Sequence, residues 1–167
     1  LVADNASLAR GFWVAGHLLN TFLLVAVLAL TAWWASDDGG VPTRSPERSH
    51  WLLLLAALAG VLLLGVSGAV TALGDTLFRV DTLEEAKAMT FSDTAHLFVR
   101  LRLWHPALAV AVGGLIAAAA WVTATRRGDA VGGRLALWLA GSYLVQLAIG
   151  LLNVWFLAPV SLQIVHL

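Results

Sequence analysis

Residues 51–73 read WLLLLAALAGVLLLGVSGAVTAL, and this stretch decides the class of the protein. It contains no charged side chain, and it is longer than the roughly 20 residues that a helix needs to cross the hydrocarbon core of a bilayer. We therefore predict that residues 51–73 form a transmembrane helix.

Three further apolar runs have the same character and predict spans at residues 12–35, 103–124 and 135–157. A last apolar stretch, residues 160–167, is too short to cross a bilayer, and we interpret it as the start of a helix that the chain does not complete. The predicted fold class is all-α. We expect a polytopic transmembrane helix bundle in one domain over residues 1–167, with four full spans and the truncated start of a fifth.

The composition agrees with lipid as the main solvent. Hydrophobic residues make up 60% of the chain and charged residues 12%, about half the usual share of charge in soluble proteins. The net charge of zero argues against a nucleic-acid partner. Because cysteine is absent, disulfides, thiolate metal sites and covalent attachment of haem are excluded. Tryptophans near the span ends suit anchors at the membrane interface, namely Trp13, Trp33, Trp34, Trp51, Trp104 and Trp121.

The segments between the spans predict a topology. Residues 36–50 are rich in Asp, Gly and Pro, and residues 74–99 are polar, with Thr82 and Glu85 in a capping-box pattern that predicts a short surface helix at 82–89. Lys and Arg are equally numerous on the two sides. The tight cluster of Arg126, Arg127 and Arg134 favours a cytoplasmic turn between the last two spans, since short loops weigh most.

Three histidines, His17, His105 and His166, lie near the ends of apolar runs. If each span crosses once, all three enter from the same side of the membrane and lie at a similar, shallow depth. With the arginine-rich turn in the cytoplasm, this is the outer side. Because an ionisable group near hydrocarbon is costly, these histidines indicate a functional site.

A neutral imidazole is a good axial ligand for haem iron, and two imidazoles at matched height on neighbouring helices can hold one porphyrin. His105 and His166 suit this arrangement best. Arg100 and Arg102, just outside His105, are placed to pair with haem propionates, because an arginine fork matches a carboxylate. We predict a non-covalent haem b, with His17 as a further metal ligand.

Simpler explanations stay open at this point. A histidine at a helix end often bonds only to water or a backbone carbonyl, and arginines near span ends often act as anchors. His50 and His96 are not expected to bind metal. Gln146 and Asn153 fit interhelical hydrogen bonding. Two alternative functions are therefore a b-type cytochrome that only passes electrons and a cofactor-free membrane assembly or transport subunit.

Several segments resemble the haem A synthases, membrane enzymes of cytochrome oxidase assembly. The order and spacing of these segments carry the resemblance, which covers nearly the whole chain. They are HLLNTFLL at residues 17–24, SGAVTALGDTLF at 67–78, VRLRLWHPALA at 99–109, QLAIGLLNVWFLAP at 146–159 and SLQIVHL at 161–167.

The resemblance implies a fragment of an eight-helix protein built as two four-helix halves. It matches His105 and His166 to the ligands of a b-type electron-transfer haem. It also matches His17 to the catalytic site where a methyl group of the substrate, haem O, is oxidised to the formyl group of haem A. The other histidine of that site and a nearby glutamate are not in this chain.

The resemblance also bears on partners and location. It implies haem O synthase and cytochrome oxidase assembly factors as partners, a homo-oligomer, and a location in a bacterial cell membrane. Pro106 departs from the family, which often has arginine there; Arg100 or Arg102 would then take over that contact. We interpret Pro106 as lying in the first turn of its helix, where proline is tolerated.

Overall fold

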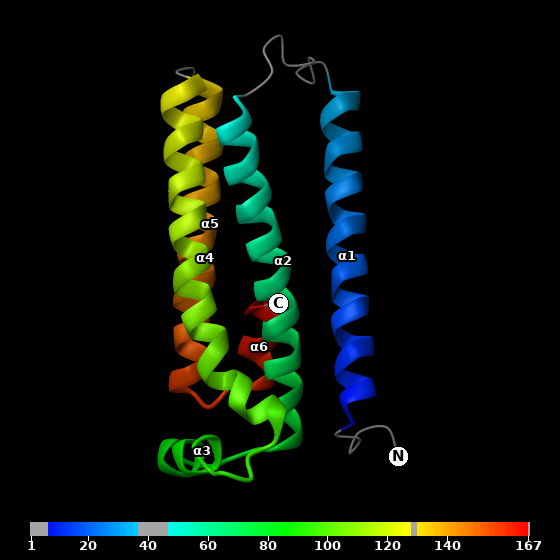
Figure 1. Cartoon of the computed structure of the whole chain (residues 1–167), viewed down its shortest axis with the longest axis vertical. Coiled ribbons are helices and arrows are strands. Elements are labelled where there is room, and N and C mark those ends of the chain that lie inside the picture. Colours follow the sequence, from blue (N-terminus) through cyan, green and yellow to red (C-terminus); the bar gives the residue numbers. More distant parts are fainter. Residues whose placement is uncertain (1–6, 37–46, 128–129, 167) are drawn as a thin grey trace.

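The computed structural model describes residues 7–36, 47–127 and 130–166, which fold into helices without any strand in these ranges. Four long helices run side by side along the long axis of the molecule, with a short helix across one end and another folded back inside (Figure 1). The predicted all-α class is confirmed. The helices are α1 (Leu8–Ala35), α2 (Arg48–Leu77), α3 (Leu83–Thr90), α4 (Leu97–Arg127), α5 (Ala130–Trp155) and α6 (Val160–His166).

Helices α1, α2, α4 and α5 are long and apolar enough to cross a membrane, as the sequence predicts. Each of the four extends beyond its predicted span at one end or both, because a helix continues past its apolar part until a cap or a breaker ends it. At the start of α1, the Ser7 hydroxyl accepts a hydrogen bond from the Arg10 backbone N–H at 3.4 Å. Helix α5 begins before its predicted span but ends two residues before the predicted limit, because Leu157 and Ala158 adopt positive φ angles of 58° and 53°.

The surface helix α3 begins one residue after the predicted limit. Its N-cap is Thr82, whose hydroxyl accepts from the Glu85 N–H at 3.2 Å. The returning bond of the capping box goes to Asp81, whose N–H donates to the Glu85 carboxylate at 3.1 Å. The local pattern therefore places this helix correctly.

The core lies where α2 and α4 meet, with α5 against α4. Ala57 of α2 packs with Val112, Ile116 and Ala119 of α4 in a buried cluster. Across the α4–α5 contact, the Tyr143 hydroxyl donates to the Ala109 carbonyl at 2.6 Å. The buried residues are mostly small, which lets the helix backbones approach closely, as in other membrane bundles.

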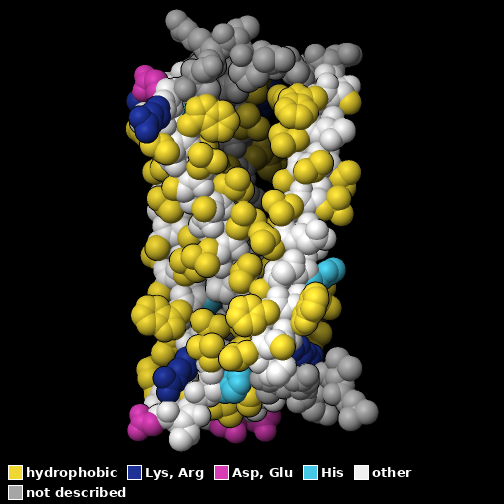
Figure 2. Space-filling model, turned by 45° about the vertical axis from the view of Figure 1, so that its right-hand side comes forward, with side chains coloured by type: hydrophobic (Ala, Val, Ile, Leu, Met, Phe, Trp, Pro, Cys, Tyr) yellow, Lys and Arg dark blue, Asp and Glu magenta, His cyan; other side chains and the backbone are white. Residues whose placement is uncertain are grey.

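Most of the outer surface is apolar. In the view of Figure 2, hydrophobic side chains cover the length of the bundle, and charged side chains gather toward its two ends. Trp13 is 81% exposed and Trp104 is 71% exposed, and the other four tryptophans named as anchors are exposed too. A lipid-facing surface explains this pattern, because so large an exposed apolar area would be unstable in water.

Pro106 lies inside α4 and not in its first turn, so the interpretation from the sequence is wrong. The helix starts at Leu97 because the His96 carbonyl accepts from Val99 and Arg100 N–H groups. A proline at this depth lacks the N–H that would bond to the Arg102 carbonyl, and its ring bends the helix. Figure 1 shows α4 changing direction in the part nearest α3.

Candidate functional site

His105 of α4 and His166 of α6 face each other across the bundle interior. Their ring centres are 6.3 Å apart and the ring planes are nearly perpendicular, at 89°. Both side chains are half-buried. Two residues 61 positions apart in the sequence are therefore brought together from separate helices.

A tight turn brings α6 to this position. After α5, Leu157 and Ala158 take the left-handed conformation, which reverses the chain at a local cost for residues with a Cβ. The Asn153 side-chain amide donates to the Leu162 carbonyl at 3.3 Å, and the Gln163 amide donates to the Ala158 carbonyl at 2.6 Å. Asn153 thus makes the interhelical hydrogen bond that the sequence predicts.

Two glycines make room for the imidazoles. A Cβ added at Gly68 would lie 2.9 Å from Cε1 of His105, and one added at Gly150 would lie 3.0 Å from Cε1 of His166. Any side chain at either position would push the ring away, so each histidine occupies space that glycine leaves.

His105 has a hydrogen-bond partner that the sequence reasoning missed. The Ser67 hydroxyl of α2 lies 2.9 Å from Nδ1 of His105. From the sequence, Ser67 is only the first residue of the SGAVTALGDTLF segment, because nothing in its spacing indicates which way α2 is turned toward α4. Nδ1 of His166, in contrast, is buried without a partner in the described part of the chain.

The two predicted arginines have different surroundings. Nε of Arg102 donates to the Asp75 carboxylate at 2.5 Å, Nη2 donates to the Phe78 carbonyl at 2.9 Å, and Nη1 is buried without a partner among the described residues. Arg100 is exposed, and its Nη2 donates to the Asp93 carbonyl at 2.8 Å. Arg102 lies one helical turn before His105 and so on the same side of α4.

The other histidines lie apart from this pair. His17 is exposed on α1, which packs mainly along α2. His50, the last residue of the segment 36–50 that the sequence places between two spans, instead lies in the first turn of α2, where it is buried and its Nε2 lies 3.2 Å from the Thr123 hydroxyl. The ring of His96 stands between those of Phe78 and Phe98, with centre distances of 5.2 and 4.6 Å.

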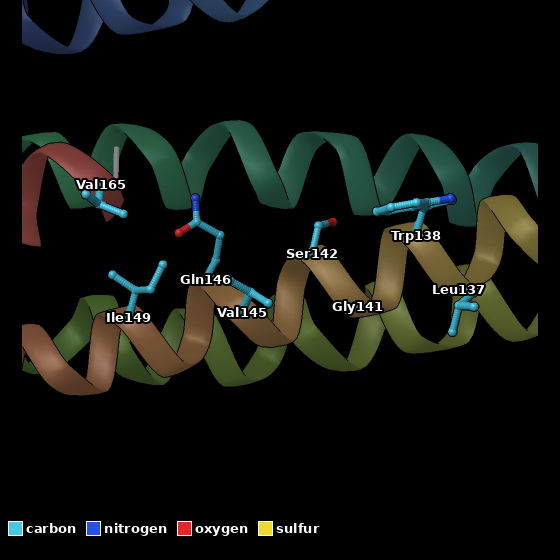
Figure 3. Close-up of a pocket in the computed structure, with 8 residues that line it drawn as sticks. All are labelled: Leu137, Trp138, Gly141, Ser142, Val145, Gln146, Ile149 and Val165. Atoms are coloured by element: carbon cyan, nitrogen blue, oxygen red, sulfur yellow. The ribbon is translucent and has the colours of Figure 1, made fainter.

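An apolar groove of about 560 Å³ runs along α5 and ends at Val165, the neighbour of His166. Figure 3 shows the side chains of Ser142 and Gln146 on the side of α5 that faces this groove, with Val165 near Ile149 at one end. Gly141 leaves open space there, with no heavy atom within 4 Å of an added Cβ.

The spacing of the two imidazoles suits one metal ion between them. An ion about 2 Å from a nitrogen of each ring would separate the ring centres by about 6 Å. No group of three or more histidine or carboxylate side chains that could hold a metal ion occurs in the described ranges. Two imidazoles are the axial pair that a porphyrin iron takes, since the porphyrin supplies four nitrogens of its own.

Comparison with known proteins places the chain in a family. Residues 4–167 match the family described as cytochrome oxidase assembly protein. Two curated proteins from two strains of Thermus thermophilus, each named protoheme IX farnesyltransferase, are 46% identical over 165 residues. The match covers 99% of this chain and 27% of each relative, so the chain spans about a quarter of their length. No solved structure gives a significant match. The chain belongs to the COX15-CtaA family of cytochrome oxidase assembly proteins, which is the haem A synthase family.

Proposed function

We propose that this chain carries the b-type haem of a haem A synthase, a membrane oxidoreductase that converts a methyl group of haem O into the formyl group of haem A. Membership of the assembly family supports the role in cytochrome oxidase biogenesis. The pairing of His105 with His166 is the observation that carries the haem proposal, because their 6.3 Å separation fits a shared metal ion.

The residues of the site fit a haem in three respects. His105 and His166 would each supply an imidazole nitrogen to hold the iron. Gly68 and Gly150 leave space for the imidazoles. The unpartnered Nη1 of Arg102 is a buried cationic donor one turn from His105, and it suits an anionic oxygen such as that of a propionate. Arg100, which is exposed at the same end of α4, would bind a second propionate at the surface of the bundle.

A haem held by two histidines supplies one-electron transfer. The chain would hold the ring, pair its carboxylates and exclude water from its faces. His17 is proposed for the separate site where haem O is oxidised.

The test is the visible spectrum of the full-length protein purified in detergent. We expect a six-coordinate b-type haem, and we expect His105→Ala and His166→Ala each to lower haem occupancy at least about tenfold. His50→Gln is the matched control, because His50 bonds to Thr123 and not to the His105–His166 pair. If both alanine variants keep the six-coordinate signal, the ligand assignment is wrong.

Pigment analysis of membranes separates the synthase from a simple cytochrome. Cells that express the full-length protein together with a source of haem O should accumulate haem A. A protein that binds haem but leaves haem O unchanged would be an electron carrier only.

The name of the Thermus relatives supplies a second candidate, transfer of a farnesyl group to protoheme IX. It is favoured by the 46% identity, although the match covers only 27% of each relative. The same pigment analysis tests it, because farnesyl transfer would form haem O from protoheme in cells that have no other source of haem O.

A further inference from the structure

Ser67 makes two hydrogen bonds with a single hydroxyl. Its Oγ lies 2.8 Å from the Leu64 carbonyl and 2.9 Å from Nδ1 of His105. The carbonyl can only accept, so the one hydroxyl proton goes to Leu64. Ser67 Oγ is then left as an acceptor toward His105.

These two hydrogen bonds determine which nitrogen of His105 carries the proton. For the second bond to form, Nδ1 of His105 must carry a proton and donate it to Ser67 Oγ. A neutral imidazole has one N–H, so the lone pair of Nε2 is free. Nε2 is therefore the nitrogen of His105 that is ready to bind a metal.

The next residue of α2 limits the position of the same ring. A Cβ at Gly68 would approach Cε1 of His105 to 2.9 Å, and Nδ1 and Nε2 each to 3.5 Å. The edge of the imidazole therefore rests on the backbone of α2 beside its hydrogen-bond partner. One hydrogen bond and one close contact together define both the tilt and the protonation of the ring.

The partner ring of His166 has a similar close contact at Gly150 but lacks the hydrogen bond. Nδ1 of His166 is buried and no described residue bonds to it. His166 also lies on α6, a helix of seven residues, whereas His105 lies within a helix of 31 residues. The two proposed ligands therefore differ: the protein gives His105 a hydrogen bond and a long helix, and gives His166 neither.

We infer that Ser67 is a positioning residue that presents Nε2 of His105 to the haem iron and strengthens His105 as an electron donor. This inference rests on the proposed haem site. Hydrogen bonding at the far nitrogen makes a ligating imidazole more basic, which favours the ferric over the ferrous state. Ser67 thus lowers the midpoint potential of the haem.

The experiment is an equilibrium redox titration of the haem in the full-length protein. Ser67→Ala should raise the midpoint potential. Ser67→Thr, which keeps a hydroxyl, should stay near the wild-type value. Ser36→Ala is the matched control, because Ser36 makes the same type of bond to a carbonyl three residues earlier, at 2.7 Å, and has no histidine partner in the described structure.

Ser67→Cys gives a second comparison if the alanine variant accumulates poorly. A thiol is a weak acceptor, so we expect an upward shift with this variant as well. Equal potentials in wild type, Ser67→Ala and Ser67→Cys would overturn the role of Ser67 while leaving the haem site intact. A wild-type protein without haem would instead overturn the proposed function itself.

Discussion

At the residue scale, the buried polar atoms without partners gather at one place. In the described part of the chain they are Nη1 of Arg102, Oδ1 of Asn153 and Nδ1 of His166. Arg102 is three residues from His105, and Asn153 is three residues from Gly150, which contacts His166. Each such atom costs about 1–3 kcal/mol when it stays unpaired, so their concentration around the imidazole pair is expected of a site that binds a polar ligand.

Gly68→Ala tests the space for His105. The added Cβ would displace the far end of a side chain and not a backbone, so we expect the fold to survive while haem affinity falls about tenfold or more. Haem titration of the apoprotein measures this. Gly114→Ala is the control, because an added Cβ there meets nothing within 4 Å, and its affinity should equal that of wild type. Equal haem affinities for the two variants would show that the space at Gly68 does not matter for haem binding.

At the element scale, α2 and α4 are held together both by packing and by charge. A Cβ at Gly74 would lie 2.8 Å from the Phe98 carbonyl oxygen, so the two backbones nearly touch there. Beside this contact, Asp75 of α2 binds Arg102 of α4, with side chains only 21% and 15% exposed. This pair fastens α4 to α2 one turn from His105.

Removal of the Asp75 charge should therefore destabilise the bundle. We expect Asp75→Asn to cost roughly 1–3 kcal/mol, because Arg102 would keep its buried charge with a weaker partner. Glu84→Gln makes the same chemical change in the exposed Lys87–Glu84 pair and should cost less than about 0.5 kcal/mol. Reversible unfolding in mixed detergent measures both. Similar losses for the two variants would show that burial of the Asp75–Arg102 pair is unimportant.

At the scale of the whole molecule, the bundle has two unlike ends. Helix α3 and the start of α4 lie at the same end as the start of α1, and the end of α4 and the start of α5 lie at the other (Figure 1). The His105–His166 pair belongs to the half nearer α3. The arginine cluster around the α4–α5 connection predicts that this connection faces the cytoplasm and that the haem site faces outward.

Because the chain has no cysteine, single cysteines report this orientation directly. We expect a membrane-impermeant maleimide to label Lys87→Cys in intact cells, and to label Thr125→Cys only after the membrane is opened. Both positions are exposed in the structure, so access depends on the bilayer alone. The reverse labelling pattern would place the imidazole pair on the cytoplasmic side.

Composition and run length by themselves determined the class and the four helices able to span a membrane, and they predicted a shared depth for the three histidines. The physical reason is that a bilayer imposes one length and one polarity on every segment that crosses it. The capping pattern determined α3 in the same local way, because Thr82 and Glu85 are neighbours on one helical turn.

Only the tertiary structure decided which side chains meet. The sequence predicts a similar depth for His17, His105 and His166, yet the rotation and packing of the helices join His105 with His166 and leave His17 exposed on α1. The partnership of Ser67 with His105 and of Asp75 with Arg102 depends on the same rotations. Helix rotation in a membrane is set by close contacts between residues far apart in the sequence, such as Gly74 with Phe98, and a uniformly apolar helix carries little periodic signal that would reveal it.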